Sequence, residues 1–165
     1  MKISNVSSPT PNKKMRILGI DPGNSRIGFG VIDATPALKL VAYNTMEVTD
    51  LLDLAQQFSK LLDEHRPDLV SIETLFFSNN QKTAMRVAQA RGVLLLKTLE
   101  RGIEITELGP MQVKMAVTSY GKSDKKAVAK MVRLLLKMDA LTGYDDASDA
   151  LAIAIAAANC TKLAT

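Results

Sequence analysis

The sequence predicts an α/β fold, a mixed five-stranded sheet with helices on both of its faces. Two features of the chain indicate this class. Three strand-like segments follow one another with only short turns between them, which is typical of an antiparallel meander. After them, segments with helical spacing of apolar residues alternate with short apolar runs, as they do when helices connect the strands of a sheet. We expect strands at residues 16–21, 27–32, 38–48, 69–73 and 103–108.

The helices are predicted from apolar periodicity and from the residues at their ends. After Asp50, leucine, alanine and phenylalanine recur at i, i+3 and i+4, and Pro67 stops this pattern. Gly102 ends a long helical segment, and Pro110 suits the first turn of the helix that follows. We expect helices at residues 51–64, 81–101, 111–119, 123–138 and 146–158.

The composition fits one folded domain without a membrane segment. The chain has 165 residues, of which 47% are hydrophobic. No window approaches ~18 consecutive apolar residues, the length that a transmembrane helix needs. Residues 1–14 are rich in serine, proline, asparagine and lysine, so we expect a flexible leader before a domain at residues 15–160. Cys160 is the only cysteine, which excludes a disulfide framework and a thiolate zinc site and favours a cytoplasmic location.

Seven basic residues are crowded into the stretch from residue 114 to residue 137. The net charge is +4, a mild excess that favours polyanions without identifying one. The position of the charges is more informative, because one stretch holds Lys114, Lys122, Lys125, Lys126, Lys130, Arg133 and Lys137. A run of charges is usually a solvated helix face. Beside acidic metal ligands, the same run would suit a substrate with a phosphate backbone.

Four carboxylates lie where a metal-dependent nuclease needs them. Asp21 ends one apolar run and Glu73 ends another, and an acid at the end of a buried strand is costly unless a cation or a donor meets it. Asp146 and Asp149 are three residues apart at the start of an alanine-rich segment, so they share one helix face. The three segments together provide oxygen ligands, the kind that Mg²⁺ and Mn²⁺ prefer.

Three segments carry a resemblance to a known family. They are Ile-Leu-Gly-Ile-Asp-Pro-Gly at residues 17–23, Gln-Ala-Arg-Gly-Val at residues 89–93 and Asp-Ala-Ser-Asp-Ala-Leu-Ala at residues 146–152. The order strand-Asp, strand-Glu, helix-Asp resembles the ribonuclease H-like nuclease superfamily. More closely, the three segments look like the motifs of the RuvC family of bacterial Holliday-junction resolvases, and the resemblance covers about residues 16–158.

This resemblance implies a crossover junction endodeoxyribonuclease that acts in DNA recombination and repair. Such an enzyme resolves a four-way DNA junction by paired symmetric nicks through two-metal-ion hydrolysis, which leaves 5′-phosphate ends. The implied cofactor is Mg²⁺, two ions per active site, with Mn²⁺ able to substitute. The implied partners are a second copy of the chain, because a two-fold symmetric junction needs two sites, and the RuvA–RuvB branch-migration complex.

The resemblance also assigns residues. Matched by motif, the catalytic metal ligands are Asp21, Glu73, Asp146 and Asp149. Phe76 matches the family's aromatic residue that stacks on a base at the opened junction centre. Lys114 and Lys125 match its basic residues near the scissile phosphate.

Some alternatives remain open on the sequence alone. Asp145 could share a helix face with Asp149, but Asp146 preserves the motif spacing, so we expect Asp145 to be an N-cap or an outer group. A nuclease similar to the YqgF family and acting on RNA is one rival function, and a catalytically idle junction-binding protein is another. Gly23 and Gly28 are expected to allow close backbone approaches rather than to act in catalysis.

Overall fold

The computed structural model describes residues 14–23, 25–74, 81–143 and 145–163. Its centre is one five-stranded sheet with the strand order β3-β2-β1-β4-β5. The strands are β1 (Arg16–Pro22), β2 (Arg26–Asp33), β3 (Lys39–Glu47), β4 (Leu69–Glu73) and β5 (Glu104–Leu108). β2 runs antiparallel to β1 and β3, whereas β4 is parallel to both β1 and β5. The predicted meander followed by alternating helices and strands is confirmed.

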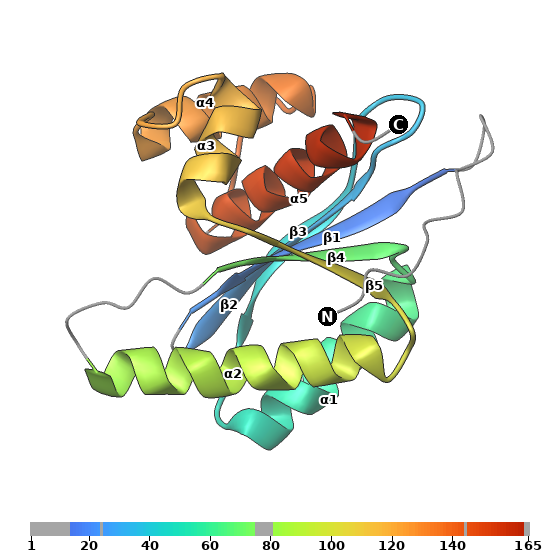
Figure 1. Ribbon diagram of the computed structural model, residues 1–165, viewed down its shortest axis with the longest axis vertical. Helices are drawn as coiled ribbons and strands as arrows, with labels where there is room; N and C mark the ends of the chain where they lie inside the picture. Colours follow the sequence, from blue (N-terminus) through green and yellow to red (C-terminus); the bar gives the residue numbers. More distant parts are fainter. Residues whose placement is uncertain (1–13, 24, 75–80, 144, 164–165) are drawn as a thin grey trace.

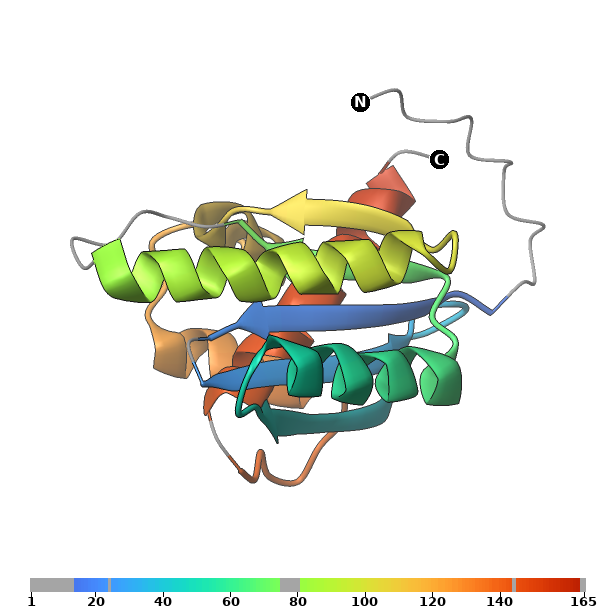
Figure 2. The same ribbon diagram turned by 90° about the horizontal axis from the view of Figure 1, so that it is seen from below.

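Helices cover both faces of the sheet, as predicted. They are α1 (Leu51–His65), α2 (Gln81–Leu99), α3 (Pro110–Thr118), α4 (Lys125–Leu135) and α5 (Asp145–Leu163). α1 and α2 lie together on one face, and α5 crosses the other face with α3 and α4 packed beside it (Figure 1). Seen from below, α1 and α2 lie in front of the sheet and α5 lies behind it (Figure 2).

Two hydrophobic cores follow from this layering. Because side chains alternate along a strand, Leu18 and Ile20 of β1 point toward α1 and α2, where Phe58 and Leu94 are fully buried. Ile17 points to the opposite core, which is built mainly on α5. From Ala150 to Ala158, each residue of α5 is at most 1% exposed, so this helix is central to the fold.

The helix ends explain where the expected bounds were wrong. Asp124, not Ser123, caps α4, because its carboxylate accepts the Ala127 amide at 2.8 Å, while the Ser123 hydroxyl donates to the Tyr120 carbonyl. α4 ends at Leu135, before the predicted residue 138, and Lys137 adopts a left-handed conformation with φ 53°. α5 runs past the predicted residue 158 to Leu163, and beyond the buried alanines the Asn159 amide donates to the Ala116 carbonyl of α3 at 2.9 Å.

Two expectations concern regions beyond the sheet. Within the described ranges, none of the helices has the length and the apolar character that crossing a membrane would require. Of the predicted leader, residues 1–13 lie outside the described residues. Lys14 does lie within them, and its ammonium forms an ion pair of 2.8 Å with Asp33. The division into a leader and a domain stays a prediction.

Candidate active site

Two of the four acids meet because β1 and β4 are parallel neighbours. The register pairs Ile20 with Ile72, so the next residues, Asp21 and Glu73, lie side by side at the same end of the sheet. Ile20 and Ile72 point into the core under α1 and α2. By alternation, the two carboxylates point toward the opposite face, which α5 covers.

α5 reaches these acids because the strands beneath it carry glycine. A Cβ atom added to Gly28 would lie 2.0 Å from the carbonyl oxygen of Asp146, and one added to Gly19 would lie 2.1 Å from that of Ala150. At Gly30 an added Cβ would lie 2.8 Å from the backbone nitrogen of Leu151. No side chain fits at these points, so the helix backbone lies directly on the strand backbones. This contact brings the first turns of α5, and with them Asp146 and Asp149, to the end of β1.

Burial and neighbouring carboxylates raise the pKa values of Asp21 and Glu73. Burial, reinforced by the negative charges of Glu73, Asp149 and Asp146, raises the pKa of Asp21 to about 7. Burial and the charge of Asp149 also raise the pKa of Glu73. Asp145 is not among the groups that act on Asp21, and its side chain is exposed, although its charge contributes to the raised pKa of Lys125. The structure therefore groups the four predicted acids electrostatically and leaves Asp145 outside them.

Cationic side chains flank the acids on two sides. The Lys125 ammonium lies 3.0 Å from Asp149, and this hydrogen-bonded pair raises the pKa of Lys125. The charges of Lys125 and Lys114 offset part of the rise in the pKa of Glu73, so both of the predicted lysines lie close to the acids. On the other side, the Arg26 guanidinium approaches Asp146 at 3.6 Å.

The connection between α3 and α4 holds the two lysines in place. The Thr118 hydroxyl lies 2.7 Å from the Ser123 hydroxyl and 2.8 Å from the carbonyl oxygen of Lys114, to which it donates. Asp124 then caps α4, which makes Lys125 its first residue. Short polar contacts thus fix the loop between the lysines, while Val113 and Val117 anchor α3 in the core.

The residues present fit a divalent cation by their chemistry. All four acids are oxygen donors, and a half-buried group of like charges is costly unless a cation offsets it. Among the residues that the structure describes, no three acids already surround one cation position. Two of the four acids form ion pairs with basic side chains, Asp149 with Lys125 and Asp146 with Arg26. Metal binding would therefore exchange these ion pairs for metal contacts.

Some functional features escaped the sequence analysis, and one expected residue lies outside the described ones. Phe76 falls in the undescribed residues 75–80. Arg26 was missed because the first residue of a strand carries no signal of its contacts. Gly19 and Gly30 could have been found, since a glycine inside a strand indicates close approach. The expected close approach at Gly28 is confirmed.

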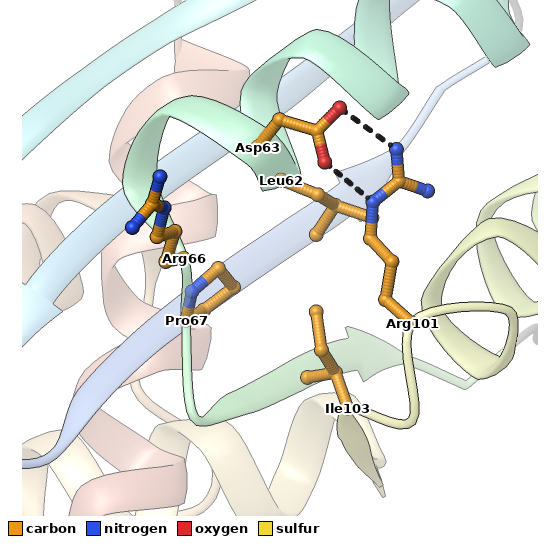
Figure 3. Close-up of a pocket in the computed structure, with 6 residues that line it drawn as sticks. All are labelled: Leu62, Asp63, Arg66, Pro67, Arg101 and Ile103. Carbon is orange, nitrogen blue, oxygen red and sulfur yellow. Dashed lines mark hydrogen bonds and ion pairs between the residues drawn. The ribbon is translucent and has the colours of Figure 1, made fainter.

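A surface pocket lies at the opposite end of the sheet and takes no part in this site. It is lined by Leu62, Asp63, Arg66, Pro67, Arg101 and Ile103 (Figure 3). Its carboxylate, Asp63, accepts two hydrogen bonds from the Arg101 guanidinium, at 2.8 and 3.0 Å. The carboxylate in this pocket is thus already paired with a cationic side chain.

Fold and site together define the class of protein. Carboxylates at the ends of two central parallel strands and on the helix that crosses them, with lysines beside them, are the arrangement of a ribonuclease H-like nuclease. A family model described as "Crossover junction endodeoxyribonuclease RuvC" matches residues 17–157. The chain therefore belongs to the RuvC family of crossover junction endodeoxyribonucleases.

Individual relatives agree with this assignment. The RuvC protein of Thermosipho melanesiensis is 42% identical over 153 residues, which cover 85% of this chain and 94% of the relative. The structure of Thermus thermophilus RuvC matches with a TM-score of 0.84 and 29% identity over 92% of this chain and 98% of that one. The T. thermophilus protein in complex with a Holliday junction substrate matches with a TM-score of 0.81 and 29% identity over 90% of this chain and 96% of that one.

Proposed function

We propose that this protein is an endonuclease that resolves four-way DNA junctions by paired symmetric nicks. The observation that carries the proposal is the group of four carboxylates from β1, β4 and α5, flanked by Lys114 and Lys125. Membership of the RuvC family supports the same activity, and the junction-bound Thermus relative supports the substrate.

Asp21, Glu73, Asp146 and Asp149 would hold the cofactor, for which we propose two Mg²⁺ ions per site, replaceable by Mn²⁺. When bound, such ions supply the positive charge that activates an attacking water and offsets charge on the leaving 3′ oxygen. The protein's own part is orientation, because the backbone contact at Gly28 fixes where α5 presents its acids. Lys125 and Lys114 would turn from the acids toward the scissile phosphate and offset the charge that builds on it. Attack by water would leave a 5′-phosphate and a 3′-hydroxyl.

The outer face of α2 supports a homodimer. Met85, Leu96 and Leu99 are 63%, 55% and 50% exposed, and the small residues Ala88 and Gly92 lie exposed between them. These five residues, the α2 stripe, recur at intervals of three and four and therefore follow one side of the helix. An apolar stripe with small residues suits close packing against the same stripe of a second copy. A two-fold dimer would supply the two active sites that a two-fold symmetric junction requires.

Further parts of the proposal rest on the family resemblance. Phe76, two residues beyond the described Thr74, would stack on a base at the junction centre. We also propose cooperation with a RuvA–RuvB branch-migration complex and a cytoplasmic location. The proposed domain spans residues 15–160, after a leader at residues 1–14.

A cleavage assay with three substrates tests the function. A mobile four-way junction, a linear duplex and a structured RNA are each incubated with the protein and Mg²⁺. We expect symmetric nicks in the junction and little cutting of the other two. Preferential cutting of RNA would favour the YqgF-like alternative, and tight junction binding without cleavage would favour the idle binding protein.

Asp21→Asn separates binding from chemistry in the same assay. Removing one ligand charge should weaken metal binding and lower junction cleavage by about 10³-fold. The lysines remain, so junction affinity in EDTA should be retained. Cleavage at a near-normal rate in Mg²⁺ would contradict the placement of Asp21 in the catalytic site.

A further inference from the structure

α4 presents basic residues that the catalytic proposal does not use. Lys126, Lys130 and Arg133 follow one another at intervals of four and three, so they form one line along the helix, here called the α4 track. All three side chains are exposed. Val128 and Val132, on the opposite side of the helix, are buried in the core.

The charge of this helix differs from that of an ordinary solvated surface helix. α4 contains four basic residues and no acidic one, whereas solvated helix faces normally mix the two signs. Two of the four, Lys125 and Lys126, occupy the first turn, where the helix dipole disfavours positive charge. Lys125 is paired with Asp149, but Lys126 and Lys130 form no ion pair with any residue in the described part of the chain. Local stability therefore does not account for the placement of these charges.

The α4 track begins at the active site and leads away from it. Lys125, the residue before the track, is 3.0 Å from Asp149, and Arg133 lies two helical turns further on, where its guanidinium donates to the Asp139 carbonyl at 3.1 Å. From Lys126 to Arg133 the helix rises about 10 Å. One DNA strand presents about three phosphates over such a length. The spacing therefore suits a strand that continues beyond the cleavage point.

The layering of the fold shows which part of the substrate would pass there. α2, the helix proposed to pair the two subunits, lies on the opposite face of the sheet from α4 (Figures 1 and 2). The dimer axis and the junction centre would thus lie on the α2 side. α4 would lie outward from them, where a duplex arm leaves the cut site.

We infer that the α4 track binds the phosphate backbone of the junction arm that leaves each active site. This inference rests on the proposed function and adds a specific surface to it. The ligand is duplex DNA, recognised by its charge without regard to sequence. The track increases the affinity for the junction and orients the duplex arm, and it takes no part in the chemical step.

The test removes two charges from the track and two from elsewhere. Lys126→Gln/Lys130→Gln is compared with Lys39→Gln/Lys60→Gln, whose exposed lysines lie on β3 and α1 and whose net charge changes equally. Junction binding is measured in EDTA by fluorescence anisotropy over a salt series, with arms of about 20 base pairs. In one version of the junction, about three phosphates beyond the cleavage point are replaced by neutral methylphosphonates. The wild type should bind the native junction more tightly than this neutralised one.

The track variant should lose that preference for the native junction, and its slope of log affinity against log salt should fall by about 1–2. The control variant should keep both, and the single-turnover cleavage rate at saturating enzyme should be unchanged in both variants. An unchanged slope and an unchanged preference for the native junction in the track variant, or a lowered saturating rate, would overturn the inference while leaving the proposed function intact. A wild type that cuts no junction would overturn the proposed function, and the inference with it.

Discussion

The two faces of the sheet are packed in different ways. On the face toward α1 and α2, large side chains such as Phe58 and Leu94 fill the space between helix and strand. On the face toward α5, Gly19, Gly28 and Gly30 leave no such space, and helix backbone meets strand backbone. Both sides of the sheet thus carry a side-chain core, but only the α5 side also has a close backbone contact, at these three glycines.

The backbone contact fixes the position of α5 on the face of the sheet where the candidate active site lies. A layer of side chains can adjust by small rotamer changes, whereas a contact between backbones fixes the height and the register of the helix. The four acids all lie on the face with the backbone contact, and α5 supplies two of them. Misplacement by about 1 Å can cost a catalytic step about 10²-fold, so a rigid attachment of α5 is valuable.

The largest expected effect on cleavage distinguishes two adjacent acids of α5. Asp146→Asn should lower the single-turnover rate by about 10³-fold, because Asp146 lies among the acids that act on Asp21. Asp145→Asn, at an exposed neighbouring carboxylate, is the matched control and should change the rate by no more than about 3-fold. The reverse ranking would show that the ligand is misplaced by one residue.

Gly28→Ala should break the backbone contact itself. The added methyl group would lie 2.0 Å from the Asp146 carbonyl oxygen, so α5 must move away from β2. We expect the single-turnover rate to fall by about 100-fold and unfolding by urea to show a loss of about 1–3 kcal/mol. A variant with normal cleavage would mean that the start of α5 adjusts freely, and the distinction between the faces would fail.

Phe58→Ala tests the other face and should give the opposite pattern. Phe58 belongs to α1 and is fully buried, so its truncation should lower the free energy of unfolding by about 3–5 kcal/mol. The acids point toward the opposite face, so folded enzyme, measured below its unfolding transition, should keep its single-turnover rate within about 3-fold. A large loss of rate in protein shown to be folded by circular dichroism would indicate that both faces position the site.

Ser71→Ala should have the smallest effect. Ser71 is buried on the α5 face beside Gly19, and its hydroxyl has no hydrogen-bond partner in the described part of the protein. Alanine keeps the residue small and removes a buried polar group, so stability should be unchanged or higher by up to about 1 kcal/mol. Thermal unfolding and single-turnover cleavage measure both effects. A clear loss of stability would reveal a partner for the hydroxyl, such as a bound water.

Much of the site could be predicted because strand ends and motif spacing are local properties. Asp21 and Glu73 each end an apolar run, and Asp146 and Asp149 have the spacing of one helix face. These patterns, with the family motifs, also predicted the order of strands and helices that the structure contains. Lys114 and Lys125 were singled out from the basic stretch by resemblance, and the structure brings both close to Glu73.

What the sequence by itself determined was the set of elements and the acids that each element carries. Only the tertiary structure decided how closely these elements approach, because the contact of Gly28 with Asp146 joins residues from distant parts of the chain. It also decided that Arg26 faces Asp146 and that Lys125 faces Asp149. Periodicity and capping depend on neighbours along the chain. The distance between a strand and the helix that crosses it depends instead on the size of the side chains between them, and here the glycines leave none.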